Sequence, residues 1–173
     1  MKQYADSVYT KVGPIVMKIV FLLTGKTTED YIIKGIEDYS ARIEKFAPFE
    51  IVTLRGLRYV GSMSALLQKE KEGGKIIEFF HADDYAVLLD ERGKEYRSVE
   101  FAGWLEDKLM IPKRRIVFVA GGAWGFSDAV YRQSDTSMSL SKLTFSHQMV
   151  RLLFLEQLYR AFTIIRKVPY HHE

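Results

Sequence analysis

The 173-residue chain contains no cysteine. This absence excludes disulfide bonds and every metal site that uses a thiolate ligand, and it fits a reducing compartment such as the cytoplasm. Long apolar runs are missing as well, because no stretch approaches the ~20 residues that cross a membrane. We therefore predict a cytoplasmic protein with no metal ion and no membrane partner.

A strong excess of one charge is also missing. Lys and Arg total 25 against 22 Asp and Glu, which gives a formal net charge of +3. This small excess permits an anionic partner such as RNA but does not require one. With 47% hydrophobic and 13% aromatic residues, the composition is that of a globular protein.

The first sixteen residues are polar and lack the apolar core of a signal peptide. Gly13 and Pro14 lie near their end, and Met17 directly begins an apolar run. We predict that residues 1–16 are an extension outside the fold. Residues 17–173 then form one domain of ordinary size.

Short apolar runs alternate with stretches of helical periodicity from Met17 onward. The predicted strands are Lys18–Leu23, Phe49–Leu54, Tyr85–Leu89 and Ile116–Ala120. The predicted helices are residues 28–46, residues 62–80 with a weak point or break at Gly73-Gly74, and a segment from Ser98 to Pro112. This order predicts an α/β fold with a mainly parallel sheet, right-handed crossovers and helices on both faces.

Two of the predicted strands end in residues that are typical of a binding site. Gly121, Gly122 and Gly125 follow the strand at Ile116–Ala120, and a polar turn at residues 90–93 follows Leu89. Glycine lets the backbone approach a ligand closely, and ligands of parallel sheets bind outside the carboxyl ends of strands. A tight turn without a ligand remains the alternative for the glycines.

After a short helix at residues 127–133, small hydroxyl residues alternate with apolar ones over residues 137–146. This pattern fits one more short strand and turn. It equally fits a loop whose hydroxyls and backbone amides hold a flat ring between apolar side chains. The sequence leaves both interpretations open.

The last predicted helix, residues 147–167, is apolar around most of its circumference. Because one sheet face covers only one side of a helix, we predict a homodimer with this helix in the interface. His147 and Arg151 lie four residues apart and form a basic pair where the interface meets the loop before it. Alternatively, both simply face water.

Five blocks, in order, resemble the ribosomal large-subunit pseudouridine methyltransferase family of the SPOUT superfamily. They are LLDERGK (Leu88–Lys94), FVAGGAWG (Phe118–Gly125), MSLSKLTFSHQMVR (Met138–Arg151), EQLYRAFTI (Glu156–Ile164) and the terminal PYHHE. The resemblance covers Met17 to Glu173. Lys167 stands where many members of the family have glycine.

The resemblance implies an α/β fold whose C-terminal part forms a deep trefoil knot, with S-adenosylmethionine bound in the knot. The implied cofactor-binding residues are Leu89, Gly121, Leu140, Ser141, Lys142, Leu143, Thr144 and Phe145. The implied substrate is a pseudouridine of 23S rRNA in the assembled ribosome, methylated on ring nitrogen 3. The alternatives are a ribosome-binding factor without catalysis and a SPOUT methyltransferase that acts on another RNA.

Methyl transfer to a ring nitrogen requires in-line positioning and removal of the nitrogen's proton. The candidates for this chemistry are His147, Arg151, Tyr170 and His171. We favour Tyr170 with His171 as the groups that shape the substrate pocket, and Arg151 as a clamp on a phosphate or base. Possible phosphate contacts are Arg55, Arg58, Lys113, Arg114, Arg160 and Arg166.

Overall fold

The computed structural model describes residues 16–55 and 64–170. Its centre is a five-stranded sheet in the order β2-β1-β4-β3-β5, in which every neighbouring pair is parallel. The strands are β1 (Lys18–Thr24), β2 (Phe49–Leu54), β3 (Asp84–Glu95), β4 (Arg115–Ala120) and β5 (Thr136–Ser139). The predicted α/β class with a parallel sheet is confirmed.

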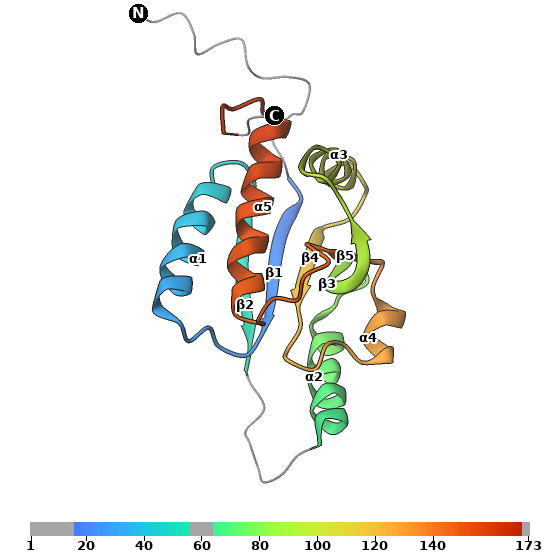
Figure 1. Ribbon diagram of the computed structural model, residues 1–173. Helices are drawn as coiled ribbons and strands as arrows, with labels where there is room; N and C mark the ends of the chain where they lie inside the picture. The colour runs from blue at the N-terminus through green and yellow to red at the C-terminus, as the bar shows by residue number, and fades with distance from the viewer. Residues whose placement is uncertain (1–15, 56–63, 171–173) are drawn as a thin grey trace, which may run out of the picture.

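Helices cover both faces of this sheet (Figure 1). The helices are α1 (Asp30–Ile43), α2 (Ala65–Phe79), α3 (Ser98–Leu109), α4 (Asp128–Gln133) and α5 (Met149–Ile165). On one face α5 lies between α1 and α3, whereas α2 and α4 pack together on the other face.

The central strands are apolar on both sides because helices cover both sides. Along β1, Phe21 joins the core beneath α1, α3 and α5, whereas Leu22 joins the core beneath α2 and α4. The rings of Phe118 on β4 and Phe154 on α5 pack against each other in a tilted arrangement, with 4.7 Å between their centroids. The sheet and α5 thus form a rigid support for the loops at the strand ends.

The structure corrects the sequence prediction in three places along the chain. The expected polar turn at residues 90–93 lies within β3, which continues to Glu95. Both Leu89 and Lys94 pair with Met138 of β5, so the chain bulges between these two residues. The expected weak point at Gly73-Gly74 does not interrupt α2, because Gly73 packs against Ser127 where no side chain would fit.

The third correction concerns the reason for expecting a dimer. α5 is covered on several sides within its own chain, by the sheet and by the flanking helices α1 and α3. At Gly35 of α1, a Cβ atom would come within 2.7 Å of the Leu152 side chain, which shows how closely α1 and α5 approach. The apolar circumference of α5 therefore does not by itself require a second subunit. The trefoil knot and the homodimer stay predictions.

Candidate functional site

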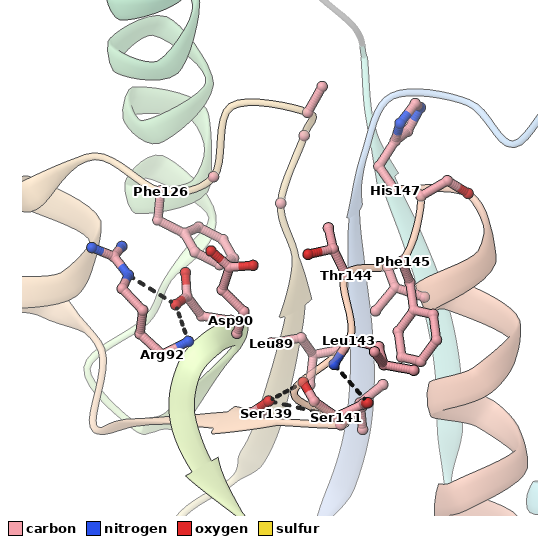
Figure 2. Close-up of a pocket in the computed structure, with 18 of the residues that line it drawn as sticks. Leu89, Asp90, Arg92, Phe126, Ser139, Ser141, Leu143, Thr144, Phe145 and His147 are labelled. Carbon is pink, nitrogen blue, oxygen red and sulfur yellow. Dashed lines mark hydrogen bonds and ion pairs between the residues drawn. The ribbon is translucent and has the colours of Figure 1, made fainter.

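A cavity of about 670 Å³ opens at the carboxyl ends of β3 and β4. Three segments line it. They are the bulged part of β3 from Leu89 to Arg92, the loop Gly121–Phe126, and the residues from Met138 to Val150 except Lys142, Gln148 and Met149. Figure 2 shows Asp90, Arg92 and Phe126 on one side and Thr144, Phe145 and His147 on the other. This volume lies within the range of small-molecule sites.

The glycine loop after β4 packs too closely against its neighbours for side chains at two of its positions. A Cβ atom at Gly121 would lie 3.0 Å from the ring of Phe126, and one at Gly122 would clash with the carboxylate of Glu72 on α2. Gly125 has φ +70, a backbone conformation that favours glycine. Packing and backbone conformation thus account for glycine at these positions in a loop that lines the cavity, and its role in binding a ligand stays a prediction.

The loop after β5 is held by its own hydroxyl groups. Ser139 Oγ donates to the carbonyl oxygen of Ser141 at 2.9 Å, and the Leu143 amide donates to Ser141 Oγ at 2.9 Å. The short strand expected within residues 137–146 is confirmed as β5, which runs directly into a loop that lines the cavity. That this loop holds a flat ring stays a prediction.

Of the eight residues that the resemblance implies for cofactor binding, Lys142 alone does not line the cavity. Its side chain is 89% exposed and approaches only Glu95, at 3.9 Å. The other residues lie together around the cavity: Leu89, Gly121, Leu140, Ser141, Leu143, Thr144 and Phe145.

A polar cluster of Asp90, Arg92 and Tyr131 forms the β3 side of the cavity. The Tyr131 hydroxyl and the Arg92 guanidinium both donate to the Asp90 carboxylate, and Arg92 also donates to the Tyr131 oxygen. Burial alone would raise the pKa of Asp90, but the hydrogen bonds from Tyr131 and Arg92 outweigh it and lower the pKa. Burial and the Asp90 carboxylate raise the pKa of Tyr131 to about 12.

This cluster was missed at the level of sequence. Asp90 and Arg92 are two residues apart on an extended strand and therefore share a face. Their pairing could have been predicted from the sequence only if the strand had been expected to continue past Leu89. Tyr131 comes from α4, and nothing in the sequence links it to β3.

His147 and Arg151 do not form the expected basic pair. His147 is exposed and lines the cavity, whereas Arg151 is fully buried. The Arg151 guanidinium donates to the Thr24 carbonyl oxygen at 2.9 Å and to Thr27 Oγ1 at 2.8 Å, and its burial lowers its pKa. In this structure Arg151 joins α5 to the end of β1 and is not placed to clamp a phosphate.

Tyr170 lies at the opposite end of α5 from the cavity. Its hydroxyl donates to Glu156 at 3.2 Å and lies 3.3 Å from the Tyr39 hydroxyl, while its ring meets Tyr159 edge-on at 4.8 Å. The hydroxyl therefore lies beside Glu156, seven residues and about 10 Å along the axis from the start of α5, and Tyr170 does not line the cavity of its own chain. His171 lies outside the described residues.

The possible phosphate contacts do not form one patch. Arg55 is exposed directly after the carboxyl end of β2, at the cavity edge of the sheet. Lys113 and Arg114 precede β4 and lie at the opposite edge, whereas Arg160 pairs with Glu156 on α5. Arg166 directly follows α5 at the helix end that points away from the cavity. Arg58 lies outside the described residues.

Within residues 16–55 and 64–170, no group of three or more metal-ligating side chains is present. No helix in that part of the chain is long and apolar enough to cross a membrane.

The profile of a family described as "Predicted SPOUT methyltransferase" matches residues 17–171. The chain belongs to this family. A curated relative, ribosomal RNA large subunit methyltransferase H of Parabacteroides distasonis, is 47% identical over 91% of this chain and 100% of its own length. The proteins of the same name from Bacteroides fragilis and Christiangramia forsetii are 47% and 42% identical over 91% and 90% of this chain, and 100% and 99% of their own lengths.

This SPOUT methyltransferase also resembles solved structures at a distance. A tRNA methyltransferase from Aquifex aeolicus is 16% identical, with a TM-score of 0.49. The alignment covers 83% of this chain and 69% of the Aquifex chain. That likeness is too weak to add to the assignment. The family membership therefore follows from the sequence match, and the cavity at the strand ends is its candidate active site.

Proposed function

We propose that this SPOUT methyltransferase uses S-adenosylmethionine to methylate ring nitrogen 3 of a pseudouridine in 23S rRNA, in the assembled ribosome in the cytoplasm. One observation carries the proposal. The three segments that the family resemblance assigns to the cofactor, distant from one another in sequence, line a single cavity. The named relatives, 47% identical over almost the whole chain, support rRNA as the substrate.

The chemistry of the cavity fits this cofactor. Leu89, Leu140 and Phe145 offer apolar walls for an adenine ring, and the glycine loop offers backbone at close range. S-adenosylmethionine, when bound, supplies a methyl group on a positively charged sulfur. The residues that line the cavity hold the ring nitrogen, the methyl group and the sulfur in line, which is the main requirement of such a displacement.

The protein must also take up the proton that leaves ring nitrogen 3. Among Tyr170, Arg151 and His147, only His147 lines the cavity of its own chain. Histidine accepts a proton near neutral pH, and this makes His147 the base available within one chain. The Arg151 guanidinium is buried and holds α5 in place, so its role is positional.

The tail fits the site only if a second copy provides it. The Tyr170 hydroxyl is held by Glu156 about 10 Å along α5 from its start, and Tyr170 does not line the cavity of its own chain. We therefore propose a homodimer in which Tyr170 and His171 of one subunit complete the cavity of the other. This arrangement keeps the substrate-shaping role of the tail and supplies a reason for the dimer that does not depend on covering α5.

Mass mapping of 23S rRNA tests the reaction. Ribosomes from a strain that lacks the gene are incubated with the purified protein and S-adenosylmethionine. We expect one added methyl on one pseudouridine. Cofactor binding in calorimetry, without any added methyl, would indicate another RNA substrate. No binding at all would favour a ribosome-binding factor without catalysis.

Mixed dimers test the shared site. One protomer carries Tyr170→Ala with His171→Ala, and the other carries Gly121→Leu, which forces a side chain against the Phe126 ring and so distorts the loop that lines the cavity. Each variant alone is expected to be inactive. In the mixed dimer, an intact cavity meets an intact tail only across the interface, so activity should return to about half of the wild-type value for a dimer with two sites. An inactive mixed dimer would place the tail in its own subunit's site.

A further inference from the structure

Trp124 is a large apolar side chain that stays exposed at the mouth of the cavity. It lines the cavity and is nevertheless 54% exposed, although tryptophan is usually well buried in a folded chain. The other tryptophan, Trp104, is half-buried and packs against Phe101, Tyr96 and Phe118. Trp124 therefore keeps an accessible indole at the site itself, where a ligand can cover it.

The loop that carries Trp124 is held firmly from behind. The Gly125 amide donates to the Gly122 carbonyl at 3.2 Å and closes a tight turn around residues 123 and 124. The Glu72 carboxylate contacts Gly122, and the buried Phe126 packs against Gly121. A ring on such a turn loses little conformational freedom when a partner binds.

Two positively charged side chains, Arg92 and Lys142, and the imidazole of His147 lie near the same opening. The Arg92 side chain is 70% exposed on the β3 side, and His147 is exposed on the α5 side. Lys142, 89% exposed and 3.9 Å from Glu95, extends from the loop that follows β5, and the acidic residues Asp90, which pairs with Arg92, and Glu91 also line the cavity. An exposed aromatic ring among positive charges is the combination that binds unpaired nucleotides, since the ring stacks on a base while the cations attract phosphates.

We propose that the Trp124 indole stacks on an unpaired base of the RNA substrate and holds the RNA over the cavity. This inference rests on the proposed function, because it assigns a positioning residue for the RNA at the same site. It assigns Trp124 to the RNA and the apolar walls Leu89, Leu140 and Phe145 to the cofactor.

Steady-state kinetics on ribosomes from the deletion strain test this assignment with Trp124→Ala and Trp124→Phe. Stacking on an aromatic side chain contributes about 1–3 kcal/mol per base, so we expect the KM of Trp124→Ala for ribosomes to rise at least about fivefold. Trp124→Phe should recover most of this loss because the smaller ring still stacks. The affinity for S-adenosylhomocysteine in calorimetry should stay within about twofold of wild type.

A matched control is Met110→Ala, which removes another exposed apolar side chain (72% exposed) at the end of α3. It should leave KM unchanged. An unchanged KM in Trp124→Ala, with an active wild-type protein, overturns the assignment but leaves the proposed function intact. A loss of cofactor affinity, or of the dimer in light scattering, also overturns it by assigning the ring to the cofactor or the partner subunit. An inactive wild-type protein would overturn the proposed function itself.

Discussion

The two ends of α5 are built in opposite ways. At its start, the chain meets the cavity through glycine backbone, short loops and exposed side chains such as His147. From its middle toward its far end, a close network of rings, hydrogen bonds and an ion pair joins Glu156, Tyr159, Arg160 and Tyr170 and reaches Tyr39 of α1.

This difference indicates which end of α5 can bind a ligand. A binding site needs free space and unsatisfied surface, and both gather where the strands end. The far end already satisfies its own polar groups and fixes the direction in which the chain leaves α5. A dimer that joins the two ends would bring an ordered tail to an open cavity. The following four substitutions break or sharpen this contrast.

The largest effect is expected at the buried anchor of the cavity end. Arg151→Ala removes a fully buried side chain, leaves a cavity and deprives the Thr24 carbonyl of its donor. We expect the free energy of unfolding to fall by about 3 kcal/mol in urea titrations.

Arg151→Met is the matched control for that variant. It keeps most of the volume and also removes a charge that is costly to bury, so it should lose only about 1 kcal/mol. Equal losses in both variants would show that the guanidinium itself, and not its volume, stabilises the start of α5.

A smaller effect is expected where the glycine loop meets α2. Gly122→Ala places a Cβ against the Glu72 carboxylate, whose Cδ would lie 3.1 Å away. Overpacking of this kind costs about 1–3 kcal/mol and outweighs the entropic gain from losing glycine, about 0.4–1 kcal/mol. We expect roughly tenfold weaker cofactor binding in calorimetry, because the loop must shift.

Glu72→Ala in the same background tests the cause. It removes the clashing carboxylate, one oxygen of which is buried without a hydrogen-bond partner in the described residues. The double variant should regain most of the affinity. Independent, additive losses would contradict a direct contact between Glu72 and the loop.

At the far end, Tyr170→Phe tests the hydrogen bonds to Glu156 and Tyr39. We expect a loss of about 1 kcal/mol at pH 7, since both bonds are long and half-exposed. Burial, the hydrogen bond with Tyr39 and the charge of Glu156 raise the pKa of Tyr170. The wild-type contribution is therefore complete below the ordinary tyrosine pKa of ~10 and declines above it, as the unfolded phenol ionises first.

Urea titrations at pH 7 and near pH 10.5 check both statements. The difference between wild type and Tyr170→Phe should shrink at the higher pH. Tyr39→Phe, the matched control, removes only one of the two bonds and should lose less at pH 7. A difference that grows with pH would mean that the ionised phenolate is the form stabilised in the folded protein.

The smallest expected effect lies where α5 ends. Lys167 adopts φ +55, and the amides of Lys167 and Val168 close the helix on the carbonyls of Ile164 and Thr163. This left-handed position favours glycine. Lys167→Gly should raise the melting temperature by a few degrees, about 0.5 kcal/mol, because relief of backbone strain exceeds the added freedom of the unfolded chain. Lys167→Ala, which keeps the strain, should not.

The sequence predicted the order of strands and helices because buried parallel strands are short, apolar and bounded by glycine or proline. It also located the cavity, since Leu89 and the glycines after Ala120 mark strand ends that a parallel sheet brings together. It did not predict that Arg151 is buried. A basic residue on an apolar helix face gives the same sequence pattern whether its guanidinium binds a partner molecule or a backbone carbonyl of its own chain. The continuation of β3 through Asp90–Gly93 was missed because its residues are those of a turn.

The two glycines in α2, Gly73 and Gly74, make this helix the segment that we expect to unfold first on heating. Gly73 and Gly74 each weaken a helix by about 1 kcal/mol relative to alanine, yet Gly73 has to stay small for Ser127 to fit. Amide hydrogen exchange should therefore open α2 before α5, which is locked between two neighbours. Glu72 belongs to α2, so unfolding of α2 removes its contact with Gly122. The loop that lines the cavity would then lose this support while the rest of the domain is still folded.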